Sequence, residues 1–182
     1  ELTLIEKGDN LEMTGGRGLC EPSLALFQGT YFLTLRNDAG GYVTTSRDGL
    51  HFEPLVPWTF DDDSELGSYN TQQHWLVHDQ ALFLSYTRRG ADNDHIARNR
   101  APLFIAQVDP VKNQVIRSTE KILIPERGVM LGNFGAAAIN PGESWEFEKL
   151  NQVLSTLGLN TNTVNIELLA SDINGDPIDE EC

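Results

Sequence analysis

Short strand-like runs separated by turn residues repeat along most of this chain, and the repeat limits the possible folds more than any other sequence feature. Four runs follow one another from residue 22 at hairpin spacing: Ser23–Phe27, Tyr31–Leu35, Gly41–Ser46 and Phe52–Trp58. A second set follows: His74–His78, Ala81–Thr87, Leu103–Val108 and Lys121–Pro125. A third set opens at Phe134–Ile139. The sequence therefore predicts an all-β chain made of four-stranded antiparallel units.

The units open at residues 22, 73 and 134, and a polar insertion at 89–100 explains the longer second step. Four-stranded units at a period of roughly 40–50 residues are typical of β-propeller blades. A β-sandwich also has many short strands, but each unit here is a self-contained meander with short turns. We count about two and a half blades, whereas propellers typically need about four to eight. We therefore expect a partial propeller that further blades or another chain could complete, or incompletely packed sheets capped by the C-terminal segment.

The sequence changes character beyond Trp145. Residues 146–157 place Phe147, Leu150, Val153, Leu154 and Leu157 at helical spacing, and Gly158 follows as a C-cap. Val164–Ala170 then predicts a strand, and an acidic tail ends the sequence. We accordingly divide the chain into propeller blades at 1–145 and a divergent segment at 146–182.

Charge and composition exclude several classes of partner. The net charge of −14 argues against a nucleic-acid backbone or an anionic membrane surface as a partner. The sequence contains no 18-residue apolar run, so we expect no transmembrane helix. Its first residues lack the pattern of a signal peptide, which suggests a processed or truncated chain. Whether the two cysteines, Cys20 and Cys182, pair is left open by their spacing.

One turn carries a more specific pattern. The strand from Tyr42 runs into Ser46-Arg47-Asp48-Gly49, and Phe52 follows three residues after the glycine. In such a turn the Asp can accept hydrogen bonds from backbone N–H groups while Gly adopts a positive φ. We expect Phe52 to cover the turn from the core side. Strand, Asp turn and aromatic residue recur in this order in carbohydrate-processing propellers, although an ordinary hairpin would look the same.

Three segments resemble the sialidase-like (neuraminidase, Asp-box) propeller superfamily over residues 1–145. They are Glu21-Pro22-Ser23 with the apolar residues after it, the run from Leu33 to Gly49 containing Arg36 and the Asp turn, and Arg100–Asp109. The resemblance implies a carbohydrate-active propeller, for which we expect a secreted or periplasmic location. Two features depart from the family: the Asp turn is one residue short and ends in Phe52, a form also found in arabinanase- and invertase-like glycosidases. The first catalytic Arg of sialidases would fall near Glu21, and this chain has no Arg at that position.

The first strand of each blade faces the propeller axis, so residues near its start are candidates for the site. His74 and Trp75 begin such a strand, and Tyr69 lies in the loop before it. A histidine beside an aromatic residue could act as a general base or contact a sugar. The alternative is a histidine bonded to backbone at a blade junction. Asn70, Gln72 and Gln73 add donors and acceptors, which favours a site.

The insertion after the sixth strand is the most polar loop. It carries Arg88, Arg98 and Arg100 together with His95. Loops on rigid sheets concentrate binding residues, and guanidinium groups match carboxylates in a two-point contact. This cluster would suit a uronic or other acidic sugar. Alternatively, Asp92 and Asp94 pair locally with the arginines in a solvated loop.

Two carboxylates, Glu21 and Glu126, open and close blade-like units, and Arg36 ends an inner strand. Such carboxylates could serve as acid and as nucleophile or base in glycoside hydrolysis, our leading interpretation. A polysaccharide lyase is a second one, because His74, Tyr69 or Tyr86, and Arg88 supply the residue types for proton removal beside a uronate. A non-catalytic carbohydrate-binding or interaction domain is the third.

No cofactor is required by any of these interpretations. Calcium is a weaker alternative at two acidic segments: Asp61–Asp63, which otherwise form a solvated loop, and Asp172, Asn174 and Asp176 in the tail. Pro177 stands where an EF-hand-like loop has Gly, so we favour a disordered acidic tail.

Overall fold

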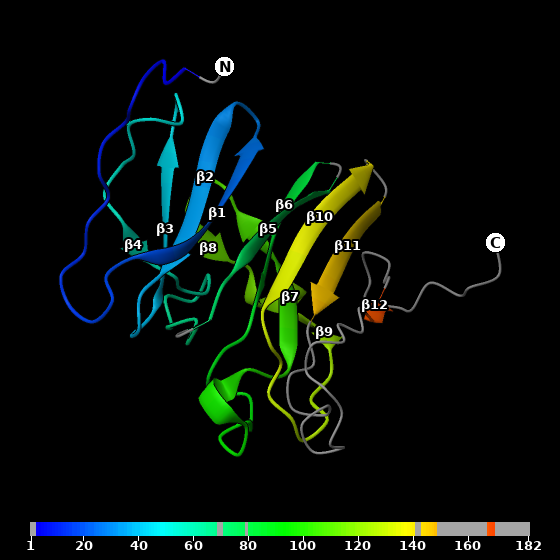
Figure 1. The fold of residues 1–182 in the computed structure, drawn as a ribbon. Coiled ribbons are helices and arrows are strands. Elements are labelled where there is room, and N and C mark those ends of the chain that lie inside the picture. Colours follow the sequence, from blue (N-terminus) through cyan, green and yellow to red (C-terminus); the bar gives the residue numbers. More distant parts are fainter. Residues whose placement is uncertain (1–2, 69–70, 79, 141–142, 149–166, 170–182) are drawn as a thin grey trace.

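The structure, a computed structural model, describes residues 3–68, 71–78, 80–140, 143–148 and 167–169. Within these residues the strands form three antiparallel sheets, and helical structure is confined to two short 3₁₀ turns, Ala97–Asn99 and Arg117–Thr119 (Figure 1). None of the helices in this part of the chain has the length and apolar character needed to span a bilayer.

The first sheet has its strands in chain order, β1 to β4, joined as a meander. Its strands are β1 Cys20–Phe27, β2 Thr30–Arg36, β3 Gly41–Ser46 and β4 Val56–Pro57. The register between β1 and β2 shifts between Cys20 and Ser23, which marks a β-bulge at Glu21. This sheet confirms the first three predicted strands, whereas the fourth, Phe52–Trp58, is shortened to Val56–Pro57.

The second sheet repeats the meander. Its strands are β5 His74–His78, β6 Ala81–Tyr86, β7 Leu103–Asp109, β8 Gln114–Val115 and β9 Lys121–Ile124. They follow the order β5-β6-β7-β8, with β9 also paired to β7. The four predicted strands are confirmed. The structure adds β8, whose two residues are too few to show a strand-like alternation in the sequence.

The third sheet contains β10 Phe134–Asn140, β11 Glu143–Glu148 and β12 Glu167–Leu169, in that order. The predicted helix is wrong where it can be compared, because residues 146–148 belong to β11. Their backbone pairs with β10 from Phe134 to Ala136 and with β12, and this pairing outweighs a helical spacing of apolar residues. The predicted strand Val164–Ala170 contains β12, and residues 149–166 lie outside the described part.

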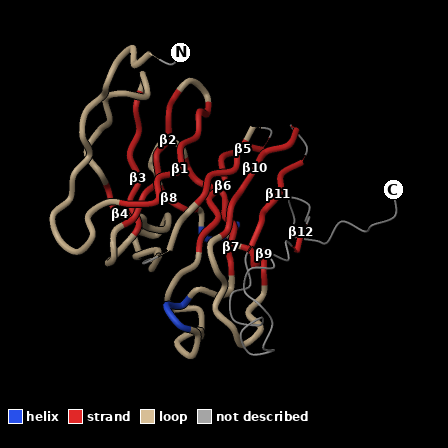
Figure 2. The backbone as a smooth tube through the Cα atoms, in the orientation of Figure 1, coloured by secondary structure: helices blue, strands red, loops and turns tan. Residues whose placement is uncertain are grey.

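The sheets pack face to face, with β5 between β1 and β10 (Figure 1 and Figure 2). One apolar core joins the first two sheets and includes Phe32, Trp58, Trp75 and Tyr86. A smaller core includes Leu103, Ile124, Leu131 and Phe134 and lies between the second and third sheets. The strands β1, β5 and β10 all begin at one end of the molecule, which brings residues near their starts together.

The Asp turn forms as predicted. Asp48 Oδ1 accepts the backbone N–H groups of Leu50 and His51, each at 2.8 Å, and Gly49 has φ +78°. The ring of Tyr31 lies 3.4 Å from the position a Cβ atom would take at Gly49, so Tyr31 covers this glycine. Phe52 is half-buried and pairs with Ser46 in an isolated bridge.

Candidate functional site

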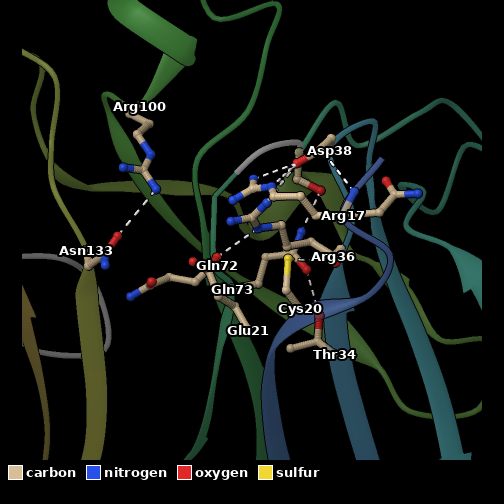
Figure 3. A network of polar contacts seen from close by, with 12 residues as sticks. Arg17, Cys20, Glu21, Thr34, Arg36, Asp38, Gln72, Gln73, Arg100 and Asn133 are labelled. Carbon is tan, nitrogen blue, oxygen red and sulfur yellow. Dashed lines mark hydrogen bonds and ion pairs between the residues drawn. The ribbon is translucent and has the colours of Figure 1, made fainter. Parts of the chain in front are cut away.

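Polar side chains gather where β1, β5 and β10 begin, and we call this region the mouth (Figure 3). It consists of Arg17, Glu21, Arg36, Asp38, Gln72, Gln73, His74, Arg100 and Asn133. Several of these polar groups are buried, among them Arg36, Gln72, Gln73 and Arg100. Buried polar side chains are costly unless they are bonded, so a concentration of them at one end of the sheets needs an explanation.

Glu21 occupies the bulge at the start of β1, with φ +54°. Positive φ is uncommon for a residue other than glycine, and bulges often re-aim a side chain. Arg36, at the end of the neighbouring strand β2, donates from Nε to Glu21 Oε2 at 2.8 Å. The arginine side chain is 3% exposed and the glutamate 32%, so a buried cation holds a partly accessible carboxylate.

Asp38 contacts two arginines. Arg17 donates to Asp38 Oδ1 from Nε at 2.8 Å and from Nη2 at 2.5 Å, while Nη1 of Arg36 lies 3.5 Å from the same oxygen. The hydrogen bond with Arg17 is the main cause that lowers the pKa of Asp38 below its ordinary value of 3.8. Sequence reasoning did not select Arg17, Asp38 or Asn133, because their partners lie far away in the chain.

A buried chain of hydrogen bonds fixes the start of β5 against the first sheet. Thr34 Oγ1 accepts from Trp58 Nε1 at 2.9 Å and donates to Gln73 Oε1 at 2.7 Å. Gln73 in turn donates from Nε2 to Ser68 Oγ at 2.6 Å. This chain holds Gln73, and therefore the adjacent Gln72 and His74, at a defined place beside β2.

His74 and Gln72 are both tied to the start of β10. Gln72 Nε2 donates to the carbonyl oxygen of Phe134, and the His74 ring hydrogen-bonds the backbone of the same residue. The His74 and Phe134 rings meet edge to face, with centroids 5.1 Å apart. Burial lowers the pKa of His74 below its ordinary value of 6.5. A neutral imidazole at this junction can accept or relay a proton.

Arg100 joins the insertion loop to the third sheet. Its Nη2 lies 3.4 Å from Asn133 Oδ1, and its carbonyl oxygen accepts from the N–H of Leu131. The loop itself is organised by the buried Asn93, whose Nδ2 donates to the carbonyl oxygens of Arg88, Asn99 and Ala101. The insertion is therefore a folded loop that holds Arg100 in place.

Tyr86 and Arg88 share Glu120 as a partner, and these contacts join them to none of the residues of the mouth. Tyr86 Oη donates to Glu120 Oε1 at 2.7 Å, and Arg88 contacts the same carboxylate from Nε and Nη2 at 2.8 and 2.7 Å. His74 is opposite Ser85 in the sheet, so Tyr86, the next residue, points to the other face. The His, Tyr and Arg proposed for a lyase are thus not brought together by His74, Tyr86 and Arg88.

The other sequence candidates occupy different environments. Trp75 lies in the core, edge to face with Trp58 at a centroid distance of 5.5 Å. His95 is exposed, and its Nε2 lies 3.4 Å from Glu126 Oε2, which ties the insertion to the loop between β9 and β10. Arg98 is exposed on the insertion with φ +60°.

The last group of candidates comprises residues in the acidic segments and at the edges of the described part. Tyr69, Asp172, Asn174, Asp176 and Cys182 lie outside the described residues. Asp62 bonds Ser64 and Arg117, and the described part of the chain contains no group of three or more His, Cys, Asp or Glu residues suited to a metal ion. Cys20 Sγ lies 3.5 Å from the carbonyl oxygen of Arg36.

A scan against protein-family models and a search of curated proteins both find no match. Solved structures do resemble the chain. A thermostable family-43 glycoside hydrolase matches with a TM-score of 0.55 and 14% identity over 91% of this chain and 52% of its own. The Bacteroides ovatus xyloglucan PUL GH43B matches at 0.51 and 11%, over 74% and 24%. A mutant of the Cellvibrio cellulosa α-L-arabinanase matches at 0.50 and 12%, over 82% and 52%.

The chain thus spans about half the length of two of these structures and a quarter of the third. At such low identity the likeness concerns the fold, and it agrees with the antiparallel sheets and with the way they pack. The chain has an all-β fold that matches part of the β-propeller of family-43 glycoside hydrolases.

Proposed function

We propose that this chain carries part of the active site of a propeller-type glycoside hydrolase that acts on an acidic glycan. The observation that carries the proposal is the partly exposed Glu21 carboxylate, held by the buried Arg36 at the start of the innermost strand β1. The bound sugar would lie across the mouth, over the starts of β1, β5 and β10.

Glu21 is proposed as the nucleophile or general base. Its ion pair with Arg36 through Oε2 fixes the position of the carboxylate. Glycoside hydrolysis needs a second carboxyl group as the acid. We propose Glu126 for this role, because its loop runs between β9 and β10 and meets the insertion through His95.

The preference for an acidic sugar is supported by the cations of the mouth. In the view of Figure 3, Arg100 and Asn133 lie on one side of Gln72, and Arg36 lies on the other with Glu21. A carboxylate placed over Gln72 would therefore have guanidinium groups on both sides. His95 and Arg98 on the insertion would extend this surface. The sialidase-like subtype belongs to the same proposal, as does completion of the ring by further blades.

The proposal is tested by incubating the chain with acidic and neutral oligosaccharides while following reducing ends and ultraviolet absorbance together. New reducing ends without absorbance are expected, and Glu21→Gln should abolish them. Glu53→Gln, on an exposed residue outside the mouth, is the matched control. Products that absorb in the ultraviolet would instead indicate a lyase. Absence of turnover, with binding retained by the folded protein, would indicate a binding domain.

A further inference from the structure

Arg17 reaches the mouth from outside the sheets. It belongs to the N-terminal segment that precedes β1, in the sequence Gly15-Gly16-Arg17-Gly18. All three glycines have positive φ, and a Cβ atom at Gly16 would lie 2.7 Å from Asp38 Oδ2. The backbone therefore passes so close to Asp38 that glycine is needed at position 16, and this path delivers Arg17 to the carboxylate.

Arg17 and Arg36 share Asp38 unequally. Arg17 contacts Asp38 Oδ1 at 2.5 and 2.8 Å, and its backbone N–H lies 3.2 Å from Oδ2. Arg36 reaches the same Oδ1 only at 3.5 Å, because its Nε is bonded to Glu21. Arg17 therefore balances most of the negative charge of Asp38, and Asp38 offsets only a small part of the positive charge of Arg36.

We propose that Arg17 is a specificity-determining residue, which neutralises Asp38 so that the mouth keeps enough positive charge to bind a carboxylate-bearing sugar. This inference rests on the function proposed above. In Arg17→Ala the backbone N–H would still hold Asp38 in place, but its charge would be balanced by Arg36 alone. An acidic sugar would then meet a weaker positive potential and bind less tightly, whereas the affinity for a neutral sugar would stay unchanged.

The charges of the mouth give this idea a sharp test. Arg17→Ala removes one positive charge, Asp38→Asn removes one negative charge, and the double variant has the same net charge as the unchanged chain. We expect the affinity for an acidic sugar to fall about three- to fivefold in Arg17→Ala, the scale of one partly exposed ion pair. Asp38→Asn should bind the acidic sugar as tightly as the unchanged chain or more tightly. The double variant should have an affinity close to that of the unchanged chain.

The probes are a galacturonic acid trisaccharide and the matching galactose trisaccharide, with binding measured by titration calorimetry at low and high salt. Arg47→Ala is the matched control, because Arg47 is also exposed but bonds Thr30 at the other end of β2. Circular dichroism verifies that each variant is folded. The loss in Arg17→Ala should be confined to the acidic trisaccharide and should shrink at high salt.

Three outcomes overturn the inference, and they differ in what they say about the proposed function. If the unchanged chain binds the acidic trisaccharide but Arg17→Ala and Arg47→Ala behave alike, Arg17 has no such role and the proposed acidic site stands. If the unchanged chain does not prefer the acidic trisaccharide at all, both proposals fail together. An equal loss for both trisaccharides would likewise overturn it and assign Arg17 a purely structural role.

Discussion

The side-chain amide of Gln73 lies directly against the backbone of Gly41, so that a Cβ atom at position 41 would overlap Nε2 of the amide. Gly41 begins β3 in the first sheet, and Gln73 immediately precedes β5 in the second. The contact therefore joins two blades beside the mouth. It also explains a glycine in a strand where a positive φ is not required, because the close approach leaves no room for a side chain.

Gly41→Ala is expected to lower the free energy of unfolding by about 1–3 kcal/mol, the usual cost of forcing extra atoms into a packed site. The overlapping amide is itself fixed by Thr34 and Ser68, so it cannot move away freely. Urea denaturation measures the change.

The control for this prediction is Gly135→Ala in β10, since a Cβ atom there would meet nothing within 4 Å. The Gln73→Ala background provides a second check, because the substitution at Gly41 should cost much less once the amide is gone. Equal costs at Gly41 and Gly135 would contradict the packing described here.

Thr34→Val tests the hydrogen-bond chain between the blades. Valine has a similar shape but would leave Trp58 Nε1 and Gln73 Oε1 without the bonds that Thr34 makes with them. We expect a loss of about 1–3 kcal/mol in unfolding free energy, because unpaired buried polar groups are costly. Thr45→Val in β3, at a less buried position, should change stability little. Similar values for the two threonines would show that the chain contributes nothing.

Much of the fold follows from local sequence pattern. Strands such as β3 and β5 were predicted with their observed bounds because alternating residues and Gly- or Asp-containing turns specify them locally. The helix predicted from Glu146 is wrong over its first three residues, because these residues pair with β10 and form a strand. The spacing of apolar residues within one segment carries no information about such a distant pairing partner.

The site could be predicted less well, for a geometric reason. Glu21, Arg36 and His74 are predicted from their positions at strand ends and Arg100 from the polar insertion, and all four lie where β1, β5 and β10 begin. Arg88 was selected with them, but it bonds Glu120 from the other face. Locating Arg88 requires the register of the sheet, and the contact between Arg17 and Asp38 requires a loop path. Neither is encoded in a local motif.

Glu120→Gln should destabilise the second blade. The Glu120 carboxylate holds both Arg88 and Tyr86, and the Arg88 side chain is 14% exposed while its guanidinium lies 4.8 Å from the Phe104 ring centroid. Removing one partner of such a pair costs about 3 kcal/mol in unfolding free energy, against about 1 for the single bond lost in Tyr86→Phe. Thermal unfolding of both variants compares the two. An unchanged midpoint in Glu120→Gln would contradict a structural role for Arg88.

His51 makes stability depend on pH through Asp48. The hydrogen bond between them, 2.8 Å from Nδ1 to Oδ2, raises the pKa of His51 above 6.5 and lowers the pKa of Asp48 below 3.8. The His51 contribution is complete below pH 6.5 and is lost as pH rises through the folded pKa. The Asp48 contribution is complete above pH 3.8 and is lost as pH falls through its folded pKa. The unfolding free energy lost in His51→Gln should therefore be largest between these two values and smaller at pH 9. A loss independent of pH would contradict the ion pair.

His74 should show the opposite dependence. Burial is the main cause that lowers its pKa below 6.5, while the bond to the Phe134 backbone and the charge of Glu21 oppose the shift. Because the unfolded histidine takes up a proton at a higher pH than the folded one, its contribution to stability falls as pH drops below 6.5. Nuclear magnetic resonance of the imidazole nitrogens measures the pKa. Titration of His74 at or above 6.5 would contradict the burial of the ring at the start of β5.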